Sequence, residues 1–194
     1  IELFGVPKGK IKTVALGADD EFYAYTPYSN STCKINVTYY GLYAPIHGVE
    51  YIIEAARLLK NDRDIHFDMI GNRGQVFEAS LSKVETLKLK NISFHYDIPQ
   101  TDHIPIAQKA DIFFGFLAKH PSIDRVIPNK VYQGLSLNKV VMTAEAPVIK
   151  SVFTHKHNIY MLPPADVTAL VSAILELKNS PKLRKDIAKN GYEL

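Results

Sequence analysis

Short runs of β-branched and aromatic residues alternate along the chain with longer segments in which apolar residues recur at helical spacing. The clearest strand covers 35–41, where Ile35, Val37 and Tyr39 share one face. The pattern predicts further strands over 12–16, 65–70, 92–96, 111–116, 139–143 and 158–162. It predicts helices over 49–59, 75–89, 104–109, 147–153 and 181–190, and two more that begin at Asn129 and after Asp166.

This alternation of strands and helices predicts an α/β fold, a Rossmann-like parallel sheet with helices on both faces. The fifth predicted strand is almost wholly apolar, which is typical of a strand covered on both faces. In such sheets ligands bind beyond the carboxyl ends of the strands, where the strand order reverses. We therefore expect one rim to gather the loops after Gly41, Gly71, Tyr96 and Phe116 and the start of the helix at Asn129.

One segment of that rim has the chemistry of an anion site. Pro128 keeps the preceding residue extended, so that Asn129 can cap a helix whose first turn contains Lys130. Asn129 and Gln133 are four residues apart and share the wetter edge of this helix. Free backbone amides, the positive end of the helix dipole and the lysine ammonium would meet there, which suits a phosphate. The alternative is a capped surface helix with a lysine in its first turn.

Composition narrows the class of protein. The chain has 194 residues, 46% of them hydrophobic, which is enough to bury a core without disulfides. The net charge of +3 is slight, and no basic run is interleaved with aromatic residues, so we predict no nucleic-acid partner. The single cysteine, Cys33, fits a reducing compartment, and we expect a cytoplasmic protein. No apolar run approaches the roughly 20 residues of a membrane span.

The ends of the sequence suggest a piece of a longer protein, because the chain begins at Ile1 rather than Met and stops at the end of a helical pattern. We interpret residues 1–28 as an entry segment from a missing N-terminal domain. Residues 29–194 would then form the Rossmann-like domain.

Five segments in a fixed order carry a resemblance to a known family. They are residues 16–19, 40–49, 52–56, 68–71 and 128–136, which read LGAD, YGLYAPIHGV, IIEAA, DMIG and PNKVYQGLS. Together they resemble the C-terminal domain of GT-B glycosyltransferases of the retaining group 1, also called family four. The resemblance covers nearly the whole chain.

The resemblance implies that this domain binds a nucleoside-diphosphate sugar as donor, without a metal or another cofactor. It places the diphosphate between the Gly41 loop and the amides near Asn129, the base against Asp97-Ile98, and the ribose near Gln133. It implies a carbohydrate or lipid-linked acceptor held by the N-terminal domain, as in polysaccharide biosynthesis. Peripheral association of the full-length protein with the inner face of the membrane stays open. The isolated fragment is expected to be inactive.

Several positions depart from the family pattern. Leu42 stands where the family has Arg, and His47 stands where it has Lys. Two family glutamates fall on Arg125 and Gln133, of which Gln133 can still bond ribose hydroxyls. His47 is either a phosphate ligand or a polar helix cap. A phosphate near it would favour the imidazolium and raise its pKa, so donor affinity would rise as pH falls from 8 to 6.

Other basic residues are expected to replace the family's Arg and Lys that are absent at positions 42 and 47. Lys119, Arg125 and Lys130 would bind the diphosphate, and Arg125 and Lys130 are the candidate catalytic residues that stabilise charge on the leaving phosphate. Arg73 either reaches the donor from the Gly71 loop or is a solvent-facing turn residue. No spacing of histidines, acids and cysteine predicts a metal site.

Two rival functions stay open. One is a nucleotide-sugar epimerase of the same fold, and the other is a non-catalytic scaffold, which the changed positions suggest. A dehydrogenase is disfavoured, because no Gly-x-Gly-x-x-Gly follows the first long strand.

Overall fold

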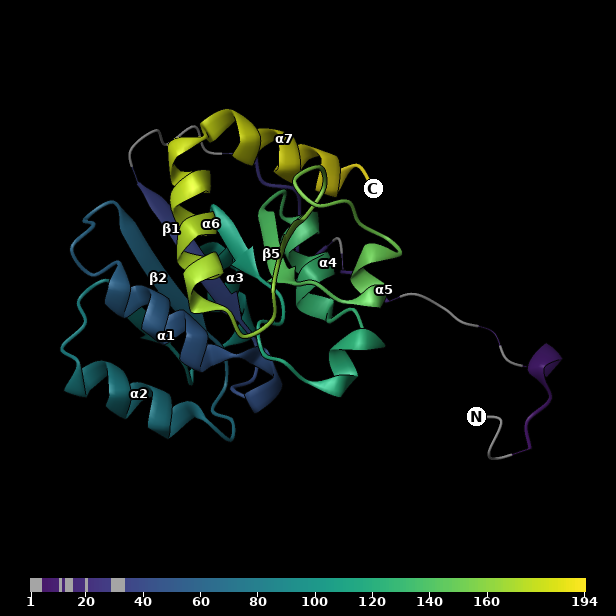
Figure 1. The fold of residues 1–194 in the computed structure, drawn as a ribbon, viewed down its shortest axis with the longest axis horizontal. Helices are drawn as coiled ribbons and strands as arrows, with labels where there is room; N and C mark the ends of the chain where they lie inside the picture. The colour runs from purple at the N-terminus through teal and green to yellow at the C-terminus, as the bar shows by residue number, and fades with distance from the viewer. Residues whose placement is uncertain (1–4, 11, 13–15, 20, 29–33) are drawn as a thin grey trace.

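A computed structural model describes residues 5–10, 12, 16–19, 21–28 and 34–194. Its centre is a six-stranded, wholly parallel sheet with the strand order β3-β2-β1-β4-β5-β6 (Figure 1). The strands are β1 (Ile35–Tyr40), β2 (Ile65–Ile70), β3 (Ile92–His95), β4 (Ile112–Phe114), β5 (Val140–Ala144) and β6 (Tyr160–Leu162). This architecture confirms the predicted fold class.

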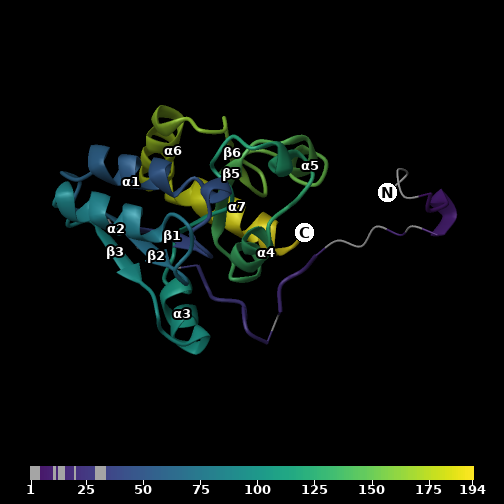
Figure 2. The same cartoon turned by 90° about the horizontal axis from the view of Figure 1, so that it is seen from below.

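Helices cover both faces of the sheet. They are α1 (Val49–Leu58), α2 (Phe77–Thr86), α3 (Gln100–Ala107), α4 (Asn129–Ser136), α5 (Pro147–Lys150), α6 (Val167–Asn179) and α7 (Pro181–Tyr192). The two views place α1, α2 and α6 on one face and α3 and α4 on the other (Figures 1 and 2). Within the described part of the chain, no helix is long and apolar enough to cross a bilayer.

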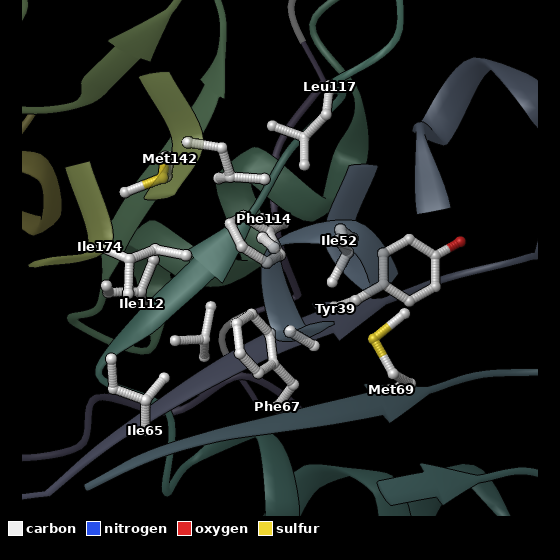
Figure 3. Close-up of a cluster of buried hydrophobic side chains, with 14 of the residues drawn as sticks. Tyr39, Ile52, Ile65, Phe67, Met69, Ile112, Phe114, Leu117, Met142 and Ile174 are labelled. Carbon is white, nitrogen blue, oxygen red and sulfur yellow. The ribbon is translucent and has the colours of Figure 1, made fainter. Parts of the chain in front are cut away.

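The two faces bury separate apolar cores, because successive strand residues point in opposite directions. Ile112 and Phe114 of β4 join the core under α1 and α6, and Figure 3 shows them beside Phe67 and Ile174. Phe113, between them, belongs to the core on the other face. β4 is therefore covered on both faces, as its sequence predicts.

Element boundaries differ from the predicted ones at several places. Helix α3 begins at Gln100 rather than Ile104, because Pro99 already precedes its first turn in an extended conformation. Helix α7 continues through Gly191 to Tyr192. β4 is shorter than predicted, and α2 begins two residues later and ends three residues earlier than predicted. Most of the strand predicted over 12–16, and Cys33, lie outside the described residues.

Part of the predicted entry segment packs on the domain. The Tyr23 side chain is buried, and the Tyr23 carbonyl accepts a hydrogen bond of 2.7 Å from the Ser136 hydroxyl. The Thr26 carbonyl accepts one of 3.2 Å from the Asn138 side chain. Residues 5–10, by contrast, lie away from the sheet in both views (Figures 1 and 2). The domain body therefore includes residues that the sequence boundary at 28 excludes.

Candidate functional site

The strand order reverses between β1 and β4, so the loops after these strands border the expected ligand site. The loop after β1 contains Gly41 at φ 145° and leads into a short 3-10 helix, η3 (Pro45–His47). Gly71 follows β2 at φ 146°, and a Cβ there would lie 1.9 Å from the Gly41 carbonyl oxygen. Both positions therefore need glycine, which lets the two loops pack against each other.

Two hollows lie side by side along this rim and share the wall formed by Tyr40 and Gly41. The α4 hollow, of about 380 Å³, is lined by Tyr40, Gly41, His47, Phe116, Pro128, Asn129, Lys130 and Gln133. The β2 hollow, of about 260 Å³, is lined by Tyr40, Gly41, Leu42, Gly71, Asn72, Ile98 and His103. The structure thus gathers most of the predicted site residues at one place.

A larger hollow of about 670 Å³ lies elsewhere, between the segment around Tyr23 and the ends of α5 and α7. No lysine, arginine or histidine lines it. Its lining is mostly apolar and aromatic, so it does not suit a charged ligand.

Lys130 is the only lysine or arginine among the residues that line the two rim hollows. It is 6% exposed, and its Nζ has no hydrogen-bond partner within the described part of the chain. Nζ lies 4.5 Å from the centre of the Tyr39 ring and 5.8 Å from that of Phe116. A Cβ at position 41 would lie 2.9 Å from Nζ, so Gly41 also makes room for this amine.

Burial lowers the pKa of Lys130 to about 7, because taking an ammonium out of water disfavours the charged form. The two aromatic rings stabilise a cation only modestly. An anion entering the α4 hollow would supply the missing counter-charge.

His47 is held in a hydrogen-bond network with Tyr39. The Tyr39 hydroxyl donates to the Leu42 carbonyl at 2.7 Å, and His47 Nδ1 lies 2.6 Å from the same hydroxyl oxygen. Because the tyrosine proton is engaged by the carbonyl, Nδ1 is assigned as the donor, which leaves Nε2 unprotonated. Figure 3 shows the Tyr39 hydroxyl at the edge of the apolar cluster.

The charge state of His47 differs from the expected one. Burial, and then the neighbouring Lys130, lower its pKa to about 4. The imidazole is therefore neutral near pH 7 in the free protein, and it does not provide a standing cation for a phosphate. Its ring stacks on Phe116, with centres 5.4 Å apart.

The start of α4 corrects the predicted cap. Pro128, not Asn129, is the N-cap residue, and its carbonyl accepts from the Val131 amide at 2.9 Å. Asn129 is the first helical residue and is exposed, without a side-chain cap. The first amides of the helix still lack intrahelical acceptors, so the anion-binding character of this end does not depend on the cap. Gln133 donates to the Tyr23 hydroxyl at 2.9 Å.

Arg73 is engaged away from both hollows. Its Nε donates to Asp97 at 2.8 Å and its Nη1 to Glu78 at 2.7 Å, with the side chain 51% exposed. These acids hold its guanidinium at the surface, which corresponds to the solvent-facing alternative. Asp97 is likewise exposed, and only its neighbour Ile98 lines the β2 hollow.

Lys119 and Arg125 are exposed, and neither lines the rim hollows. Arg125 directly follows the 3-10 helix η4 (Pro121–Asp124), in the segment before α4 begins. The expected trio of cations is therefore not assembled in this structure. Lys130 alone reaches the α4 hollow, and Leu42 presents an apolar side chain to the β2 hollow.

A comparison with family models decides the classification. The model of glycosyl transferases group 1 matches residues 30–194. The chain belongs to this family. No sequence among the curated proteins matches it.

Solved structures of group 1 glycosyltransferases and related proteins share the fold. The C-terminal domain of LpcC from Francisella tularensis has a TM-score of 0.73 at 19% identity, over 91% of this chain and 95% of that one. Anabaena HepE in complex with UDP-glucose has a TM-score of 0.71 at 16% identity, over 91% of this chain. TarM of S. aureus in complex with UDP has 0.77 at 15% identity, over 98% of this chain.

This group 1 chain spans 50% of the length of HepE and 37% of TarM. The family-model match confirms the predicted family. These likenesses, one of them to a C-terminal domain, confirm the predicted half of a GT-B fold. At such low identity they establish the fold alone.

His103 is a titratable residue of the rim that was not predicted as part of the site. His103 of α3 is 4% exposed, its Nε2 has no partner within the described part of the chain, and it lines the β2 hollow. Its ring meets that of Tyr40 edge-on, with centres 5.8 Å apart. If the predicted helix had begun at Gln100 instead of Ile104, His103 would have been placed in the first turn of a helix at the rim.

No cluster of three or more His, Cys, Asp or Glu within the described ranges is arranged to hold a metal ion.

Proposed function

We propose that this domain binds the nucleoside-diphosphate sugar donor of a glycosyltransferase, and that the full-length protein transfers the sugar to an acceptor held by an N-terminal domain. The observation that carries the proposal is the buried amine of Lys130, which has no hydrogen-bond partner among the described residues and lies in a hollow at the reversal point of the sheet. Membership of group 1 and the UDP-glucose complex of HepE, a protein of the same fold, support it.

The diphosphate would occupy the α4 hollow, next to Lys130 and the first amides of α4. The base would lie in the β2 hollow against Ile98, and the ribose near Gln133, beside the shared wall of Tyr40. The glycines at 41 and 71 leave the backbone close to the ligand. No metal is needed in this arrangement, because the helix end and the amine face the phosphate oxygens.

Glycosyl transfer breaks the bond between the sugar and the phosphate, so negative charge grows on the leaving diphosphate. Lys130 would stabilise that charge more in the transition state than in the ground state. The apolar rings around its amine strengthen the interaction, because a low local dielectric screens charge less than water does. In this proposal Arg125 does not contact the donor, because it lines neither of the rim hollows.

Binding of nucleotides to the isolated chain tests the proposal. Thermal shift and calorimetry with uridine, guanosine and adenosine diphosphates and their glucose esters should identify one preferred base. The matched variants are Lys130→Met, which removes the rim amine, and Lys60→Met, an exposed lysine beyond the far end of α1. We expect Lys130→Met to bind about 100-fold more weakly and Lys60→Met to keep the affinity of the unmodified chain.

The rival functions give different results. Absence of binding by every nucleotide would favour the non-catalytic scaffold. Binding without sugar transfer by the full-length protein, together with epimerised donor, would favour the epimerase. The isolated chain should not transfer sugar, because the acceptor and the groups that activate it lie in the other domain. Sugar transfer by the isolated chain would contradict this division of roles.

A further inference from the structure

No described residue that lines the α4 hollow places a negative charge beside the Lys130 amine. Tyr39 of β1 and His47 of η3 face it, Tyr40 and Gln133 also line the α4 hollow, and no acidic side chain is among the lining residues. The nearest polar atoms are already engaged, since the Tyr39 hydroxyl bonds to both Leu42 and His47. A permanent ammonium here would be a buried charge without a partner, which is strongly unfavourable.

We propose that donor binding is coupled to the uptake of one proton, because the buried amine of Lys130 has no counter-charge among the residues that line the empty α4 hollow and becomes an ammonium when a diphosphate supplies one. This inference rests on the proposed function, and it names how proton concentration regulates the same site. The proton comes from solvent and adds to the lone pair of Nζ. The entering diphosphate supplies the counter-charge.

The neighbouring groups do not titrate in the relevant range. Burial lowers the pKa of His47 to about 4 and raises that of Tyr39 far above its ordinary value, so neither changes charge between pH 6 and 9 in the free protein. Lys130, with a pKa of about 7, does. The liganded state binds more protons than the free state. Donor affinity therefore falls as pH rises above 7, until the pKa of the liganded amine is reached.

Calorimetry in buffers of different ionisation enthalpy measures the uptake directly. The probe is UDP-glucose, or the GDP- or ADP-sugar that binds in its place, because a sugar diphosphate diester has no group that titrates near neutrality. For the unmodified chain we expect uptake of about 0.9 proton at pH 8 and about 0.1 at pH 6. Lys130→Met should show almost none at either pH, whereas His47→Gln and Lys60→Met should keep the dependence.

A second measurement does not require the donor sugar. The pKa of Lys130 is read from the ¹³Cε shift of labelled lysine, with assignment by Lys130→Met. We expect a midpoint near 7 in the free chain and a rise to about 10, close to the ordinary pKa of lysine, with saturating inorganic pyrophosphate.

The outcomes separate the two proposals. A Lys130 midpoint above 9 in the free chain, or donor binding without proton uptake at pH 8, overturns the coupling and leaves the binding function intact. Uptake that disappears in His47→Gln but persists in Lys130→Met assigns the proton to the histidine and also overturns it. Failure of every nucleotide sugar to bind rejects the proposed function itself.

Discussion

Two cations are buried near opposite ends of the same sheet, and their surroundings are opposite. At the amino end, Arg184 is fully buried and donates to the Tyr28 hydroxyl at 2.8 Å and to the carbonyls of Leu177 and Lys178. Tyr28 in turn contacts Asp111, whose carboxylate also accepts from the Asn36 amide at 2.9 Å. At the carboxyl end, Lys130 is almost as deeply buried and has no hydrogen-bond partner within the described residues.

The difference teaches how to separate a structural cation from a binding one. Arg184 is satisfied by the protein, and its network ties the entry segment to α7 and the start of β4. The Lys130 amine has no hydrogen-bond partner among the described residues. Its burial therefore destabilises the free protein, and we expect only a bound anion to compensate for this. The strongest test of the comparison is to remove each cation and measure both stability and binding.

The largest effect is expected from Arg184→Met. It leaves two carbonyls and the Tyr28 hydroxyl without their donor, so the free energy of unfolding should fall by about 3 kcal/mol. Urea denaturation measures this, and the exposed neighbour Lys185→Met, on the same helix, is the control. Nucleotide affinity per folded molecule should not change. A change below about 0.5 kcal/mol would show that the amino-end network is not structural.

Lys130→Met should have the opposite effect, lowering nucleotide affinity without lowering stability. Nucleotide affinity should fall by about 100-fold, because a buried charge partner of the diphosphate is lost. The free energy of unfolding should stay constant or rise, since methionine fills the space without an unpaired amine. Calorimetry and urea denaturation measure the two quantities, with Lys60→Met as the matched lysine change. Equal losses of stability in Lys130→Met and Arg184→Met would remove the distinction between the two cations.

The pH dependence of stability sharpens the same contrast. The pKa of Lys130 is lowered to about 7 in the folded chain, so between pH 7 and its ordinary value the unfolded chain binds more protons than the folded one. The folded state therefore gains stability as pH rises through this window. Relative to Lys130→Met, the unmodified chain should gain about 2 kcal/mol between pH 7 and 9.

Burial also lowers the pKa of Lys139, to about 8, but this residue is present in both chains and cancels in the difference. Urea denaturation across the pH range supplies the measurement. Parallel curves for the two chains would mean that Lys130 keeps an ordinary pKa.

The smallest effect is expected from the exposed cations. Arg125→Met and Lys119→Met should each change nucleotide affinity less than about threefold, because surface charges outside the hollows are screened by water and salt. Calorimetry on the two variants measures this. A loss of tenfold or more for Arg125→Met would show that its loop moves onto the ligand, and it would restore the expectation drawn from the sequence.

The sequence predicts much of the fold because hydrophobic periodicity is local. The strand from Ile65 to Ile70 and the cap of α6 by Asp166, whose carboxylate accepts from the Ala169 amide at 2.8 Å, are both confirmed. The predicted start of α3 was wrong by four residues, and Pro105 lies inside the helix. Sequence pattern therefore locates elements better than their ends.

The candidate site was predicted only in part, because some of its properties depend on contacts between distant parts of the chain. The segment around Lys130 was identified, and its place at the rim follows from the strand alternation. The burial of its amine could not be predicted, because it is created by two other parts of the chain, the end of β1 with Tyr39 and Gly41 and the segment after β4 with Phe116. The neutral state of His47 depends on the same contacts. Charged residues such as Arg125 and Arg73 were assigned to the site by type, whereas loop geometry and acidic neighbours keep them at the surface.

A crystal structure of the chain with its preferred nucleotide sugar tests the central claim most directly. The account predicts density for the diphosphate in the α4 hollow, with a phosphate oxygen about 3 Å from Lys130 Nζ and the base extending along the β2 hollow. Density at another place, such as the apolar hollow near Tyr23, with no anion beside Lys130, would contradict it.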